Sequence, residues 1–267
     1  MTHYNSFDCY LSLWGNASHE HFKEEWDAVV CIGPNDSDLI TTLIPGIQRH
    51  VSPRRIYIIT HPSVIAMHQN QFDRVEFVSE YNFPFSMQYI HDAFKTHERS
   101  GWYFQQLLKL YAPLVIPAMK SQYVIVDADV RFHKDVRFFE RDKIQFNVGT
   151  EYHIPYFQHM ERLLGISKKT KHSGICHMMP MKRHLVQALI DHVEQKHGTL
   201  FWKAFLDKVD PIEYRYSGAS EYEMLLNFAL VHFPNEVEIQ PLQWQNTGSK
   251  ETNQSYDYEA YHWYGRH

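Results

Sequence analysis

Short runs of β-forming residues alternate with segments of helical periodicity along the first half of the chain. The predicted strands are residues 27–33 (DAVVCIG), 54–60 (RRIYIIT), 74–80 (RVEFVSE) and 123–126 (YVIV). Between them, residues 39–50 and the segment GWYFQQLLKLYAPLVI at 101–116 carry apolar side chains at helical spacing. Strands and helices that alternate in this way build a mainly parallel sheet from right-handed βαβ units. The sequence therefore predicts an α/β fold in which helices flank such a sheet.

The second half of the chain contains two turns that are each followed by an amphipathic helix, in residues 172–195 and 217–230. In the second of these, Ser220 and Glu223 have the spacing of a capping box at a helix start. No low-complexity linker, internal repeat or change of composition divides the chain. A single domain is therefore predicted for residues 1–267.

Polar residues follow the predicted strands at their carboxyl ends. They are Gly33, Pro34, Asn35 and Asp36 after the first strand, Thr60 and Glu80 at the ends of the next two, and Asp127 and Asp129 after the fourth. In sheets of this class the ligand crevice lies outside the carboxyl ends of the strands. We therefore expect one cleft to contain these residues, and the polar, aromatic C-terminal segment could fold back over it.

Two aspartates separated by one alanine come directly after a buried strand, in YVIVDADVRF. Residues i and i+2 of an extended segment point to the same side, so Asp127 and Asp129 can converge on one cation. Carboxylate oxygens suit Mg²⁺ or Mn²⁺, ions that keep open positions for water and substrate phosphates. The pattern predicts a site for a metal ion and a diphosphate, and the alternative is a solvated turn.

Composition excludes several classes of function. The 26 basic residues against 31 acidic ones give a net charge of −5, so nucleic acid is not an expected partner. The 3 cysteines form no CxxC pair, which argues against a disulfide framework or a zinc ribbon. The first residues lack the pattern of a signal peptide, and no window approaches the roughly 18 apolar residues that span a bilayer. We expect a cytoplasmic protein without a transmembrane segment.

The succession VVCIGPND, IYIIT, GWYFQQLLKL, YVIVDADVRF, HSGICHMM and SGASEYE resembles the GT-A glycosyltransferases, in particular bacterial and viral members with GWYxQQ, DxD and SEYE motifs. The resemblance covers roughly residues 27 to 247. It implies a Rossmann-like GT-A fold and the metal-dependent transfer of a sugar from a nucleotide-sugar donor, most commonly a UDP-sugar, to a hydroxyl of a glycan or glycoconjugate. It also implies a nucleotide-sugar-binding half at about 27–130, an acceptor-binding half at about 131–247 and a C-terminal tail at 248–267.

The resemblance assigns the metal and donor residues. Asp129 would ligate a Mn²⁺ or Mg²⁺ ion, Asp127 would contact the metal, its waters or the donor ribose, and His262 is the candidate third ligand. The other expected donor-binding residues are Gly33, Pro34, Asn35, Asp36, Thr60, Gln105, Gln106 and Lys109. Gln105 and Lys109 are four residues apart and share a helix face. The alternatives are ordinary turns after the strands and an exposed helix face.

The same resemblance suggests the acceptor and catalytic residues. His177, Ser217 and Gly218 are expected to bind the acceptor or the transferred sugar, although His177 could equally be a structural histidine. Glu221 is the candidate general base of an inverting transfer, because such a transfer needs a carboxylate to take the acceptor proton. The alternative for Glu221 is a carboxylate that is stabilised by the helix dipole.

Three other functions fit parts of the pattern. A haloacid-dehalogenase-type phosphatase also uses D-x-D after a strand, but it favours Thr or Val where this chain has Arg131. A metal-dependent nucleotidyltransferase acting on sugar phosphates would share the metal and the fold type, but no glycine-rich, basic motif follows the first strand. A non-catalytic carbohydrate-binding module would use the aromatic residues and leave Asp127 and Asp129 without a role.

Overall fold

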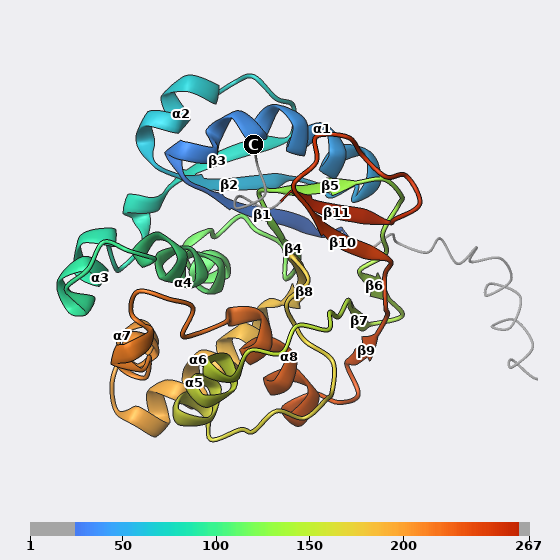
Figure 1. Ribbon diagram of the computed structural model, residues 1–267. Coiled ribbons are helices and arrows are strands. Elements are labelled where there is room, and N and C mark those ends of the chain that lie inside the picture. Colours follow the sequence, from blue (N-terminus) through green and yellow to red (C-terminus); the bar gives the residue numbers. More distant parts are fainter. Residues whose placement is uncertain (1–24, 262–267) are drawn as a thin grey trace, which may run out of the picture.

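A five-stranded sheet forms the centre of the structure, a computed structural model that describes residues 25–261 (Figure 1). The strands are β1 (Asp27–Ile32), β2 (Ile56–Thr60), β3 (Val75–Ser79), β4 (Gln122–Asp127) and β8 (Met178–Lys182), in the order β3-β2-β1-β4-β8. The first four strands in the sequence are parallel, and β8 is antiparallel to β4. This arrangement confirms the predicted α/β class with a mainly parallel sheet.

Helices cover both faces of this sheet, and alternate residues of β1 contact the two layers. Val30 belongs to the apolar cluster that includes α1 (Ile40–His50), whereas Val29 and Cys31 belong to the cluster that includes α4 (Ser100–Val115). Figure 1 shows α1 and α2 (Pro62–His68) on one side of the sheet. The other side holds α3 (Met87–Phe94), α4, α5 (Ile154–Leu164), α6 (Arg183–His197), α7 (Phe201–Asp207) and α8 (Glu221–His232). Because both faces are covered, β1 is buried along its whole length.

Two small sheets and three 3₁₀ helices complete the described part of the chain. The sheets are β10 (Trp244–Thr247) with β11 (Tyr258–Tyr261) and β5 (Val130–Phe132), and β6 (Phe139–Glu140) with β7 (Lys143–Phe146) and β9 (Val237–Ile239). The 3₁₀ helices are η1 (Pro34–Leu39), η2 (Glu80–Asn82) and η3 (Pro211–Glu213). The expected C-terminal tail thus contains a strand, β11, which pairs with β5 directly after the two aspartates. Among residues 25–261, every helix is too short or too polar to cross a membrane.

The strand order determines where a ligand crevice can form. β1 has β2 on one side and β4 on the other. The strands that follow β1 in the sequence are therefore added first on one side of it and then on the other, and the order reverses between β1 and β4. In open parallel sheets the binding crevice lies at such a point, outside the carboxyl ends of the strands. Asp127 ends β4 and η1 follows β1, so the predicted donor and metal residues lie on the two sides of this point.

Candidate active site

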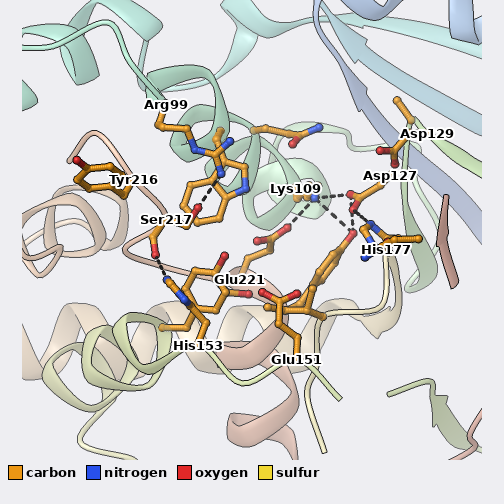
Figure 2. A pocket seen from close by; sticks show the side chains of 18 of the residues that line it. Arg99, Lys109, Asp127, Asp129, Glu151, His153, His177, Tyr216, Ser217 and Glu221 are labelled. Atoms are coloured by element: carbon orange, nitrogen blue, oxygen red, sulfur yellow. Dashed lines mark hydrogen bonds and ion pairs between the residues drawn. The ribbon is translucent and has the colours of Figure 1, made fainter. Parts of the chain in front are cut away.

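The carboxylates at the end of β4 lie beside a histidine. The backbone N–H of Asp127 donates to the carbonyl of His177 at 2.8 Å, and His177 Nδ1 lies 3.4 Å from Asp127 Oδ2. Asp129 follows in the turn before β5, and one ligand atom from each of the three side chains lies within 4.8 Å of the others. The pairing of β4 with β8 thus brings together three side chains of types that can ligate a metal (Figure 2).

The loop that carries His177 is held by another buried carboxylate. Glu223 accepts hydrogen bonds from Ser173 Oγ at 2.7 Å and from the backbone N–H of Gly174 at 3.0 Å. A Cβ atom at Gly174 would lie 2.5 Å from the carbonyl oxygen of Tyr222, so the loop packs directly on the first turn of α8. His177 has a φ of 62°, a left-handed conformation that a non-glycine residue keeps only where its surroundings hold it. These contacts fix His177 next to Asp127.

The predicted capping box is half correct. The Ser220 hydroxyl accepts a hydrogen bond from the backbone N–H of Glu223 at 3.3 Å and caps α8 as expected. The Glu223 carboxylate does not return to Ser220, because it is turned toward the 173–174 loop and also accepts from Lys168 at 3.1 Å. Contacts between Glu223 and residues distant in the sequence thus replace the local hydrogen bond to Ser220 that the motif predicted.

A buried lysine joins the metal-binding end of the site to Glu221. Lys109 Nζ lies 2.6 Å from Asp127 Oδ1 and 2.6 Å from Glu221 Oε1, and the Tyr222 hydroxyl donates to Asp127 at 2.8 Å. Burial alone would lower the pKa of Lys109, but the two carboxylates outweigh burial and raise this pKa. One ammonium group is therefore the counter-ion of two carboxylates.

The two carboxylates respond differently to burial. Burial raises the pKa of Glu221, and Lys109, the only described side chain that hydrogen-bonds its carboxylate, opposes this effect without cancelling it. Burial also acts to raise the pKa of Asp127, yet Lys109 and His177 together hold that pKa below its usual range. Asp127 is thus firmly anionic, whereas Glu221 takes up a proton more readily than an exposed glutamate does.

The side chains at this end of the site fit a divalent cation. Asp127, Asp129 and His177 each offer one ligand atom, and these atoms lie within 4.8 Å of one another. Two carboxylates and an imidazole form a donor set that suits Mn²⁺, and Mg²⁺ when water supplies further oxygen ligands. The donor types and their spacing therefore favour a divalent ion at this position.

Two adjoining cavities open at the carboxyl edge of the sheet. The first cavity has a volume of about 750 Å³ and contains Asp127, Asp129 and His177. The second cavity has a volume of about 1140 Å³ and lies at the ends of β1, β2 and β3. Both are lined by Asp36, Arg99, Trp102 and Gln105. The site therefore has room for two chemical groups on either side of this shared wall.

Most of the expected donor-binding residues line these cavities. Gly33, Pro34, Asn35 and Asp36 line the second cavity, Gln105 lines both, and Lys109 and Asp127 line the first. Thr60 and Gln106 line neither cavity and make internal contacts instead. The Thr60 hydroxyl donates to the carbonyl of Ile32 at 2.7 Å, and Gln106 accepts from the backbone N–H of Glu221 at 3.0 Å.

Some of the expected acceptor and catalytic residues line the first cavity, and others make internal contacts. His177, Ser217 and Glu221 line the first cavity, although Glu221 is only 4% exposed. Gly218 does not line it, because the residue is packed so tightly that a Cβ atom would lie 2.6 Å from the Cβ of Glu213. His262 lies outside the described residues, and within them His177 is the side chain beside the two aspartates.

Several cavity residues carried no signal in the sequence. They are Arg99, which precedes α4, Glu151 and His153, which precede α5, Arg215 and Tyr216, which follow η3, and Asn246 on β10. Burial raises the pKa of Glu151, which makes it a second candidate proton acceptor in the cavity. All of these residues except Asn246 lie in or beside a connecting segment, and only the folded chain brings these segments together.

Comparisons with known proteins give one family and remote structural similarities. Residues 30–265 match the model of a family described as "Family of unknown function (DUF6492)", and no curated protein matches the sequence. The galactosyltransferase LgtC in complex with donor and acceptor sugar analogs is similar with a TM-score of 0.48 and 10% identity, over 88% of this chain and 86% of that chain. The apo form of mouse xyloside xylosyltransferase 1 gives a TM-score of 0.47 and 7% identity, over 89% and 97%. Because these similarities are remote, we derive the function from the side chains of the site.

Proposed function

The chain belongs to DUF6492, a family of unknown function, and we propose that it is a metal-dependent glycosyltransferase. The proposed reaction moves a sugar from a UDP-sugar to a hydroxyl of a glycan or glycoconjugate, with inversion at the anomeric carbon. The observation that carries the proposal is the position of Asp127, Asp129 and His177 beside two adjoining cavities. The second cavity would take the nucleoside. The first cavity, which contains the carboxylates, would hold the diphosphate and the sugars.

Asp127, Asp129 and His177 would hold the divalent ion. A bound Mn²⁺ or Mg²⁺ would neutralise the negative charge on the diphosphate leaving group. Lys109 and His177 favour the anionic form of Asp127 that this role needs, and the Tyr222 hydroxyl also donates to it. Asp36 and Gln105, in the wall shared by the two cavities, are placed to contact the donor between its nucleoside and its sugar.

Glu221 is the proposed proton acceptor. It lines the first cavity, and Lys109 opposes the effect of burial on its charge. In an inverting transfer the acceptor oxygen attacks the anomeric carbon as its proton passes to a carboxylate. Once Glu221 has taken that proton, Lys109 still has Asp127 as its counter-ion, so the buried ammonium is not left unpaired.

A direct test is to incubate the purified protein with a set of UDP-sugars, candidate glycosides and Mn²⁺, and to identify every product by mass spectrometry. Release of UDP together with a new glycoside, lost on addition of EDTA, is the expected result. Asp129→Asn should lower kcat/KM by about 10³-fold. Release of UMP, pyrophosphate or inorganic phosphate would indicate a nucleotidyltransferase or phosphatase, and metal-independent glycan binding without turnover would indicate a binding module.

The proton acceptor is tested by comparing Glu221→Gln with Glu151→Gln. Glu221→Gln should lower kcat by about 10²-fold or more and leave the Kd for UDP unchanged, because only the proton transfer is lost. A larger loss of kcat in Glu151→Gln would assign the proton transfer to Glu151. An NMR assay of the anomeric configuration of the product tests inversion separately.

A further inference from the structure

Arg99 is a half-buried cation in the wall of the first cavity, and no carboxylate of the described residues lies within ion-pair distance of it. Its Nη2 donates to Ser217 Oγ at 2.8 Å, and its guanidinium lies 4.8 Å from the centre of the Trp102 ring. Burial lowers the pKa of Arg99, and the nearby Tyr156 and Tyr103 oppose this effect without cancelling it. The positive charge is thus partly desolvated and has no counter-ion among residues 25–261.

A second arginine, Arg54, shows how a guanidinium with a structural role is paired in this protein. Arg54 is also partly buried, and its guanidinium donates to both oxygens of Asp27 at 3.0 and 2.8 Å. That fork-like pairing uses the geometry in which arginine binds carboxylates most strongly. Arg99 has the same donor groups, but its hydrogen-bonding partner is a hydroxyl.

The surroundings of Arg99 hold its donors toward the cavity. Arg99 has a φ of 58° immediately before α4, so the start of the helix fixes the direction in which the side chain leaves the backbone. Ser217 is held in turn, because its carbonyl oxygen lies 2.8 Å from His153 Nε2. A guanidinium has five N–H donors, and Arg99 uses one of them on a side chain. The remaining donors of the guanidinium are available to a ligand.

The charged groups of the first cavity are separated by sign. Figure 2 shows Arg99, Ser217 and Tyr216 on one side and Asp127, Asp129 and His177 on the other, with Lys109 and Glu221 between them. The acidic side fits a metal ion and the diphosphate that it would bind. On the basic side, no described carboxylate pairs with Arg99, and an uncompensated guanidinium in a partly dry wall is unfavourable unless an anion completes it.

We propose that Arg99 and Ser217 form a subsite for an oxyanion, a carboxylate or phosphate group carried by one of the two sugars that the enzyme joins. This inference rests on the proposed glycosyl transfer and adds to it that one of the joined sugars is acidic. A planar guanidinium binds a carboxylate or phosphate through two parallel hydrogen bonds, and Ser217 holds the Arg99 guanidinium in place for them. A neutral sugar hydroxyl cannot supply the missing negative charge.

The acidic group can belong to the donor or to the acceptor, because Arg99 lines both cavities. Two sets of probes separate these sources, and in each set the members differ only in the group at C6, which is either neutral or anionic. UDP-glucuronate and UDP-glucose test the donor. Methyl β-D-glucoside, its 6-carboxylate and its 6-phosphate test the acceptor, and they need neither metal nor turnover. Binding is measured by calorimetry or ligand-observed NMR on the full-length chain.

The wild-type protein should bind a charged member of at least one set about tenfold more tightly than its neutral partner. Arg99→Gln should reduce this ratio to within about twofold, and Arg99→Lys should keep part of it because the charge remains. Arg162→Gln is a matched control, since this exposed arginine does not line the cavity. Thermal unfolding of each variant shows that it is folded.

Two results would overturn the subsite. One is a wild-type protein that binds the charged and neutral members of both sets equally. The other is a preference that persists in the folded Arg99→Gln protein. If the proposed glycosyl transfer is wrong, the protein should neither bind UDP nor turn over a UDP-sugar. The glycoside probes would still report on Arg99 in that case.

Discussion

Two glutamates at the start of α8 have similar surroundings and face different parts of the molecule. Glu221 and Glu223 are both buried, and each is ion-paired with one lysine, Lys109 and Lys168 respectively. Glu221 faces the first cavity through a single lysine contact, whereas Glu223 accepts hydrogen bonds from a loop, an asparagine and its lysine. Many contacts make Glu223 a structural residue, and few contacts leave Glu221 available for chemistry.

Replacement of the two lysines should have the largest effect on stability. Lys109→Met removes the only ammonium between Asp127 and Glu221, and an uncompensated buried charge costs about 3–5 kcal/mol. Lys168→Met should cost less, about 1–2 kcal/mol, because Glu223 keeps its other donors and Lys168 is more exposed. Urea unfolding in the presence of EDTA measures both. Equal losses would contradict the view that Lys109 alone compensates the carboxylates of the site.

Replacement of the glutamates should separate stability from activity. Glu223→Gln should lower the free energy of unfolding by about 2–3 kcal/mol, because it puts an amide N–H₂ among hydrogen-bond donors. Glu221→Gln should lower it by less than about 1 kcal/mol, since the glutamine oxygen can still accept from Lys109. Turnover should show the opposite order once both proteins are confirmed as folded. If Glu221→Gln is the less stable variant, the two assignments must be exchanged.

The loop beneath Glu223 gives a smaller and more local test. Gly174→Ala places a Cβ atom against the Tyr222 carbonyl, and such overpacking costs about 1–3 kcal/mol. It should also weaken Mn²⁺ binding, because the same loop positions His177. Gly46→Ala is the matched control, since no atom lies near its added Cβ and a helical glycine-to-alanine change stabilises by about 0.5–1 kcal/mol. Unchanged metal affinity in Gly174→Ala would show that this loop does not position a metal ligand.

The sequence predicted what depends on local pattern and missed what depends on distant contacts. Periodicity located the four parallel strands, and alternation along an extended segment predicted that Asp127 and Asp129 converge. β8 was not predicted, because MMPMK has none of the β-branched or aromatic residues typical of strands and its proline is tolerated only at an edge. The position of His177 beside Asp127 depends on that strand pair, so it could not be inferred either.

Charged pairs were missed for a related reason. Helical spacing put Gln105 and Lys109 on one face, but no local pattern shows that Lys109 meets Glu221 on a helix much later in the chain. The absence of an acidic partner around Arg99 is likewise a property of the folded chain. Side chains that project from connecting segments carry no periodicity, and this site takes much of its chemistry from them.

The last prediction is a pH dependence that distinguishes the Lys109 site from the Lys168 site. Burial raises the pKa of Glu221 in the folded protein, and loss of the ammonium in Lys109→Met should raise it further. A carboxyl group with a raised folded pKa binds a proton more tightly in the folded state, so its contribution to stability is present below the unfolded pKa and is lost as the pH rises through the folded value. The difference in unfolding free energy between wild type and Lys109→Met should therefore shrink as the pH is lowered from 8 toward 5, by up to about 1.4 kcal/mol per pH unit.

Urea unfolding at several pH values in EDTA measures this difference, with Lys168→Met as the parallel variant. A Lys109→Met deficit that stays constant with pH would mean that its carboxylates are hydrated or paired in another way, and Glu221 would then lose the buried environment on which its proposed role depends.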